Sequence, residues 1–140
     1  MNDKLNFILP KNINALVIHC SDTDDNFPIE AIDIHKMHLN FGWDGIGYHK
    51  VVLRDGKVEN GRPEYWVGAH VKGKNNESLG VCLIGSDKFT VKQLKSLELI
   101  LKDWKSKYPN AKITGHCNVV KTKKTCPNFD VISWSQNLKL

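Results

Sequence analysis

The sequence predicts an α/β fold with a central mixed β-sheet flanked by helices. Three observations predict it: short apolar runs of strand length recur, segments with helical spacing separate them, and one pair of strands is joined by a tight turn. The chain of 140 residues has the length of one domain. We therefore expect a single domain over residues 1–140, in which residues 1–13 form an N-terminal extension.

The first half of the chain contains one strand and one helix before the tight turn. Residues 15–19 form an apolar run that leads into a polar cluster, as expected for a buried strand followed by a loop. Pro28 favours the first turn of a helix, which we expect to run to about Asn40 and to end before Gly42. The apolar residues near one face of this helix are Ile29, Ile32 and Leu39.

The rest of the chain alternates strands with a second helix. Residues 46–53 are a predicted strand, and residues 54–57 (RDGK) form a tight turn into its partner. Residues 79–85 and 112–114 are further predicted strands. Thr90 can cap a helix that ends before Pro109. The apolar residues at helical spacing in that helix are Val91, Leu94, Leu97, Leu101 and Trp104.

The composition is that of a globular protein with a basic surface. Hydrophobic residues make up 41% and charged residues 25%, and the net charge is +5. A positive charge favours anionic partners. The basic residues form no stripe interleaved with aromatics, so we expect no nucleic-acid partner. No apolar run approaches the roughly 20 residues that span a bilayer, so we expect no membrane anchor.

The N-terminal segment predicts the compartment in which the chain is made. Residues 1–11 lack the basic start and long apolar stretch of a secretory signal peptide. We therefore expect the chain to stay in the cytoplasm of the producing cell until something releases it. The four cysteines then stay reduced and remain available for metal binding or packing.

Three residues are candidate metal ligands. His19 lies at the end of a predicted strand, His116 follows another, and Cys126 lies in the loop beyond. Imidazole and thiolate suit zinc, and three protein ligands leave a fourth position for water, as in catalytic sites. The residue types alone leave other sets open, because six histidines and four cysteines offer many combinations.

Strand and helix geometry removes some alternatives. Neighbouring residues on a strand point to opposite faces, so we do not expect Cys20 to share a site with His19, nor Cys117 with His116 if that segment is extended. Cys82 lies in an apolar strand and is expected in the core. Two histidines of the first helix are expected at the surface or in helix packing, and these are His35 and His38.

Several longer motifs occur in a fixed order along the chain. They are Ile18-His19-Cys20-Ser21, Gly42-Trp43, Ile46-Gly47-Tyr48-His49, Arg54-Asp55-Gly56 with Gly61-Arg62, Gly68-Ala69-His70, Ser78 to Leu83, Gly115-His116, and Lys124-Thr125-Cys126-Pro127-Asn128-Phe129-Asp130. Over about residues 14 to 134 the sequence resembles the type 2 N-acetylmuramoyl-L-alanine amidases. This family includes phage amidase lysozymes and peptidoglycan recognition proteins, and the likeness is closest to the small phage lysozymes.

The resemblance implies a zinc cleft on one face of the sheet, with Zn²⁺ held by His19, His116 and Cys126. It implies that Tyr48 and Lys124 are catalytic. Zinc lowers the pKa of bound water toward about 7, and a fixed cation near the scissile carbonyl stabilises the oxyanion. Lys121 and Lys123 are alternatives to Lys124 if the register of the loop differs.

Two further histidines have different expected roles. His70 is placed by the resemblance near the substrate cleft, where it is a candidate substrate contact. His49 points away from Tyr48 on the same strand and is expected to be a structural histidine with satisfied hydrogen bonds.

The function implied is a zinc-dependent peptidoglycan amidase, an endolysin that cuts between N-acetylmuramic acid and L-alanine. We expect a monomer that reaches the cell wall by holin-type release at lysis. One alternative is a non-catalytic peptidoglycan-binding module, although such relatives typically lack the cysteine ligand and Cys126 is present here. The other is a regulatory protein that docks on a phage RNA polymerase.

Overall fold

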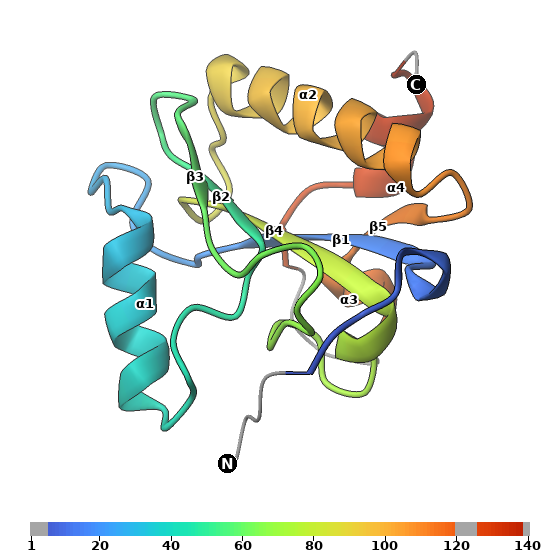
Figure 1. Ribbon diagram of the computed structural model, residues 1–140. Helices are drawn as coiled ribbons and strands as arrows, with labels where there is room; N and C mark the ends of the chain where they lie inside the picture. The colour runs from blue at the N-terminus through green and yellow to red at the C-terminus, as the bar shows by residue number, and fades with distance from the viewer. Residues whose placement is uncertain (1–5, 120–125, 139–140) are drawn as a thin grey trace.

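The computed structural model describes residues 6–119 and 126–138, with a five-stranded sheet at its centre (Figure 1). The strands are β1 (Ala15–Cys20), β2 (Lys50–Val52), β3 (Val58–Asn60), β4 (Ser78–Leu83) and β5 (Lys112–Gly115), paired in the order β3-β2-β4-β1-β5. The helices are α1 (Ala31–Asn40), α2 (Val91–Lys107), α3 (His116–Val119) and α4 (Val131–Gln136), with short 3-10 turns η1 (Pro10–Asn12) and η2 (Asn75–Glu77). β2 and β3 pair antiparallel and the other pairings are parallel, so the predicted mixed sheet is confirmed.

The two central strands are buried on both faces. β1 lies between β4 and β5, and every residue after Ala15 is buried; β4 is buried throughout. Parallel strands covered on both faces carry continuous apolar runs rather than alternating ones. This explains why both segments are visible in the sequence as short hydrophobic stretches.

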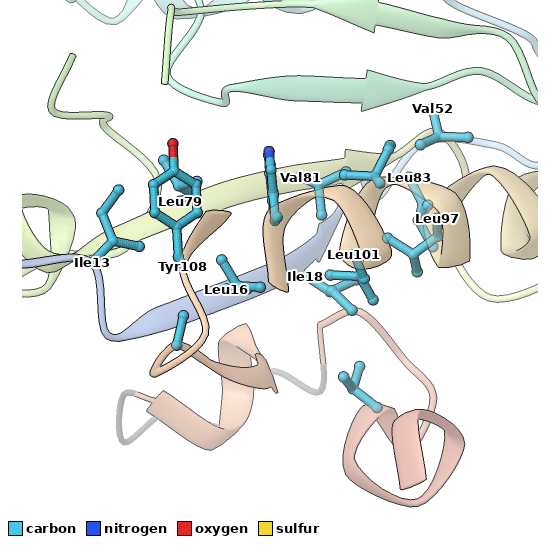
Figure 2. Close-up of a cluster of buried hydrophobic side chains, with 14 of the residues drawn as sticks. Ile13, Leu16, Ile18, Val52, Leu79, Val81, Leu83, Leu97, Leu101 and Tyr108 are labelled. Atoms are coloured by element: carbon cyan, nitrogen blue, oxygen red, sulfur yellow. The ribbon is translucent and has the colours of Figure 1, made fainter. Parts of the chain in front are cut away.

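One face of the sheet packs against α2. Leu16 and Ile18 of β1 belong to the same cluster of buried side chains as Leu97 and Leu101 of α2, and all four are labelled in Figure 2. Trp104 of the same helix is fully buried there. This layer is the larger part of the core.

The opposite face of the sheet packs against α1 and carries the polar residues of interest. Ile34 of α1 packs with Val51 and Cys82 in a second buried cluster. Because side chains alternate along a strand, His19 points to this side while Ile18 points toward α2. Figure 1 shows α1 and α2 on opposite sides of the sheet.

The predicted start of α2 is confirmed, but one residue of its buried face was missed. Thr90 caps the helix, accepts a hydrogen bond from the Gln93 backbone, and forms a capping box with the Gln93 side chain. Gln93 is fully buried, whereas Val91 is 82% exposed. The Gln93 side-chain amide donates to the carbonyls of Val52 and Ile84, which lets a polar residue occupy the core.

Two details predicted for α1 are wrong. The helix begins at Ala31 rather than at Pro28, because Glu30 and Asp33 form a capping box there. Ile32 and Leu39 are exposed, and the buried residues are Ile34 and His38.

The inward face of α1 is instead set by two histidines. His38 Nδ1 accepts a hydrogen bond from the Gly47 backbone at 2.9 Å, and His35 Nδ1 accepts one from Ile46 at 3.1 Å. Both histidines therefore serve helix packing, as predicted.

The predicted strand over residues 46–53 is shorter in the structure. Only Lys50–Val52 form β2, because the segment before it bonds to loops: Gly47 accepts from Ala69, and Tyr48 accepts from Arg62. The tight turn into β3 is confirmed, with Gly56 at φ 90°. Among the described residues, no helix is long and apolar enough to cross a membrane.

We predict that Gln93→Ala lowers the free energy of unfolding by about 2–4 kcal/mol, because the buried carbonyls of Val52 and Ile84 each lose one of their donors and Arg54 loses an acceptor. Urea denaturation measures this loss. Gln136→Ala, at an exposed position near the end of α4, is the matched control and should change stability by less than about 0.5 kcal/mol. Equal effects of the two substitutions would show that the buried amide does not stabilise the fold.

Candidate metal centre and active site

The structure brings the three predicted metal ligands together. One potential ligand atom from each of His19, His116 and Cys126 lies within 4.8 Å of the others. The ring centroids of the two histidines are 4.7 Å apart. Two imidazoles and one thiolate form a donor set that fits zinc and leaves one coordination position open.

The parallel pairing of β1 with β5 explains this convergence. Ile18 of β1 is the register partner of Gly115 of β5. The next residues along the two strands are His19 and His116. Both histidines therefore lie side by side at the carboxyl ends of β1 and β5. Cys126 lies at the same ends of these strands, and its carbonyl accepts a hydrogen bond from the Cys117 backbone at 3.0 Å.

The environment favours the thiolate form of Cys126. Its pKa is lowered to about 3, chiefly by the hydrogen bond from the Cys20 thiol and also by the neighbouring His116, His19 and Cys20 backbone. Burial lowers the pKa of His19, which keeps its imidazole neutral. Deprotonated sulfur and neutral imidazole are the forms that bind a metal.

The position of Cys20 differs from the prediction. Its thiol was expected away from the site, but its sulfur lies 3.7 Å from that of Cys126, and its backbone N–H donates to the same sulfur at 3.2 Å. Cys20 is the last residue of β1, and Cys126 crosses the end of that strand, so the alternation of faces no longer separates them. Cys20 is not a member of the ligand cluster itself.

Tyr48 lies beside the candidate ligands. Its ring centroid is 5.1 Å from that of His19 and 5.5 Å from that of His38. Burial raises the pKa of Tyr48 well above its usual value, and its hydroxyl shares a hydrogen bond with the Cys82 thiol. The hydroxyl therefore stays protonated and is able to donate. The predicted lysine, Lys124, and its alternatives Lys121 and Lys123 lie outside the described residues.

His70 and His49 form a buried layer behind His19. His70 Nδ1 lies 2.9 Å from His19 Nε2. His49 Nδ1 accepts from the Gly80 backbone at 3.0 Å, and His49 Nε2 lies 2.8 Å from the Trp66 carbonyl oxygen. The structural role predicted for His49 is thus confirmed, while the substrate contact predicted for His70 stays a prediction.

The candidate ligands open into a cavity of about 800 Å³, a volume typical of small-molecule sites. Its apolar wall is formed by Met37, Phe41 and Trp43, and Phe41 is 61% exposed. These residues were not singled out as site residues from the sequence. The available signal was the pair of aromatics next to the glycine that ends α1.

Comparison with known proteins identifies the family. A profile described as N-acetylmuramoyl-L-alanine amidase matches residues 9–129. The chain belongs to the N-acetylmuramoyl-L-alanine amidase family. The endolysin of Enterobacteria phage K11 is 37% identical to this amidase over 139 residues, which is 94% of this chain and 91% of that one. The endolysin of Escherichia phage T7 is 37% identical over 145 residues, covering 98% and 95% of the two chains.

Solved structures agree with this assignment. The amidase LysC from Clostridium intestinale URNW superposes on this amidase with a TM-score of 0.81 at 29% identity, covering 96% of this chain and 91% of that one. Bumblebee PGRP-SA superposes with a TM-score of 0.82 at 26% identity, covering 96% and 86% of the two chains. The predicted resemblance is therefore confirmed in both sequence and fold.

We predict that Cys20→Ala raises the pKa of the Cys126 thiol in the metal-free amidase by roughly one to three pH units, because the largest cause of the lowered pKa is removed. The measurement is the pH dependence of alkylation at Cys126, followed by mass spectrometry of that peptide. Cys117→Ala is the matched control and should leave the titration unchanged. An unchanged titration in the Cys20 variant would assign the low pKa to the histidines instead.

Proposed function

We propose that this amidase is an endolysin that hydrolyses the bond between N-acetylmuramic acid and L-alanine in peptidoglycan, with one Zn²⁺ held by His19, His116 and Cys126. The observation that carries the proposal is the convergence of these three side chains at the wall of a cavity of about 800 Å³. The relatives support the substrate, because they are endolysins and N-acetylmuramoyl-L-alanine amidases by name.

The donor set supports zinc as the cofactor. When bound, zinc supplies a Lewis acid that activates water and polarises the scissile carbonyl. The thiolate of Cys126 offsets part of the positive charge of the metal, which weakens that polarisation. A cationic side chain beside the ligands compensates for this loss, and Lys124 is two residues away from Cys126 in the sequence.

Tyr48 and Lys124 are the proposed catalytic residues. The Tyr48 ring lies next to His19 and its hydroxyl is protonated, so that the hydroxyl can donate a hydrogen bond to the oxygen on which negative charge develops. Lys124 supplies a positive charge to the same oxygen. His70 remains a candidate contact with the substrate, since it lines the inner wall of the cavity.

The cavity is lined by both apolar and polar side chains, which suits a glycopeptide. Phe41 and Trp43 offer apolar surface against which sugar and alanine groups can pack. Asn75 also lines the cavity and offers a side-chain amide N–H group for a peptide carbonyl. The net charge of +5 favours association with an anionic cell wall.

The biological setting follows from the endolysin role. We propose that the amidase accumulates in the cell that makes it and reaches the wall at lysis. The proposed ligands and the cavity all come from one chain, so a monomer is sufficient for activity.

We predict that chelation abolishes release of stem peptides from purified peptidoglycan and that added zinc restores it. Cys126→Ala should reduce the rate at least about 1,000-fold, because the site loses its only anionic ligand among the three. Cys117→Ala is the matched control and should digest at close to the parent rate. A Cys126→Ala protein as active as the parent would overturn the zinc mechanism.

We predict that Lys124→Ala lowers kcat about 100–1,000-fold, the usual cost of removing one oxyanion stabiliser. Lys121→Ala and Lys123→Ala are matched controls from the same stretch of sequence and should stay within a few-fold of the parent. Steady-state digestion of soluble peptidoglycan fragments measures all three. A large loss in one of the controls, with Lys124→Ala unaffected, would transfer the role to that neighbour.

A further inference from the structure

The imidazole of His70 fits in its place because the two neighbouring residues, Gly68 and Gly80, have no side chain. A Cβ atom added at Gly80 would lie 2.5 Å from His70 Nδ1, and one added at Gly68 would lie 2.7 Å from His70 Cδ2. Two glycines from separate segments thus allow the backbone to approach the imidazole on two sides. The ring has little freedom to turn, so the directions of its two nitrogens are fixed.

The Nε2 side of this ring faces hydrogen-bond acceptors. Ser78 Oγ lies 3.4 Å from His70 Nε2, and the same Oγ donates its single hydrogen to the Lys74 carbonyl at 2.7 Å. The Ser78 hydroxyl can therefore only accept from His70. A further hydrogen bond joins the His70 ring to the Ser78 carbonyl, which is also an acceptor. Both contacts require the hydrogen of the imidazole to be on Nε2, the ring nitrogen that faces Ser78.

The opposite nitrogen then acts on His19. A neutral imidazole carries one N–H, so His70 Nδ1 is an acceptor and His19 Nε2, 2.9 Å away, must donate to it. The ring of His19 is held on edge to that of His70, with an interplanar angle of 86°. His19 Nδ1 is left as the nitrogen with a lone pair, so it is the atom that His19 can offer to the cluster with His116 and Cys126.

We propose that His70 is a positioning residue that fixes the tautomer and the ring orientation of His19, so that His19 presents Nδ1 to the metal. His19 donates a hydrogen bond to His70, and His70 in turn donates one to Ser78. This inference rests on the proposed function, because it assigns His70 a role toward the zinc site. It differs from the substrate contact predicted for the same residue, since both ring nitrogens already have protein partners.

Two nearly isosteric substitutions test the proposal. Asn places an oxygen acceptor close to the position of His70 Nδ1, whereas Leu has a similar shape and no acceptor. Zinc affinity is measured by competition with a chelator, and kcat and KM by digestion of soluble fragments. We expect His70→Leu to weaken zinc binding about 10–100-fold and to lower kcat with little change in KM. His70→Asn should recover most of both losses.

A spectroscopic measurement supports the comparison. In the zinc-loaded parent, ¹⁵N NMR of the imidazoles should report hydrogen on His19 Nε2 and metal on His19 Nδ1. In the zinc-loaded Leu variant the His19 Nε2–H signal should exchange with water faster, because its acceptor is missing. The opposite assignment of the two nitrogens in the parent would overturn the proposal.

The outcomes separate this inference from the function on which it rests. If the parent binds zinc but His70→Leu binds it equally tightly, the positioning role is wrong and the proposed function stands. If His70→Leu raises KM alone, His70 is a substrate contact. If the parent neither binds zinc nor digests peptidoglycan, the proposed function fails and this inference fails with it.

A second variant covers the case in which His70→Leu does not fold. Ser78→Ala removes one acceptor at His70 Nε2 and touches neither His19 nor the cavity. We expect its zinc affinity to stay within a few-fold of the parent and the hydrogen to stay on His19 Nε2, because the Ser78 carbonyl remains as an acceptor for His70. Metal on His19 Nε2 in the zinc-loaded Ser78→Ala protein would overturn the proposal.

Discussion

The parallel pairing of β1 with β4 and β5 is the constraint on which the site depends. β1 pairs with β4 over Ala15–Cys20 and with β5 over Ala15–Ile18, so its register cannot slip without losing two ladders. A slip by one residue would turn His19 from the α1 side to the α2 side and bury it among aliphatic side chains. The core of the fold therefore specifies where the first ligand lies and which way it points.

The chemistry of the site follows from placing these groups out of water. Burial favours a neutral imidazole at His19, while the hydrogen bond from the Cys20 thiol and the neighbouring imidazoles favour the thiolate at Cys126. The first effect favours an uncharged group and the second an anionic one, but both favour the deprotonated form that binds a metal ion. Each group is already in its metal-binding form before any ion arrives, which reduces the cost of binding at neutral pH.

The parts of the fold that were predicted correctly are those with a strong local signal. β1, β4 and α2 were predicted because a doubly covered strand is continuously apolar and a long helix repeats its apolar spacing. The apolar face predicted for α1 was wrong. His38 lies on the buried face because its ring accepts a hydrogen bond from the Gly47 backbone, and the spacing of apolar residues does not predict such a contact. The position of Cys20 was missed for a similar reason, because it depends on a distant loop crossing the strand end.

The presence of His70 in the core needs an explanation beyond packing. Burying an imidazole costs more free energy than burying an aliphatic side chain of the same size, unless both nitrogens have partners. Here one partner is Ser78, which is itself fully buried, and the other is His19. Glycines at positions 68 and 80 add a further cost, because glycine loses more conformational entropy on folding than other residues. An apolar side chain would fill this space at a smaller cost in free energy. The presence of His70 is therefore better explained by the orientation that it imposes on His19.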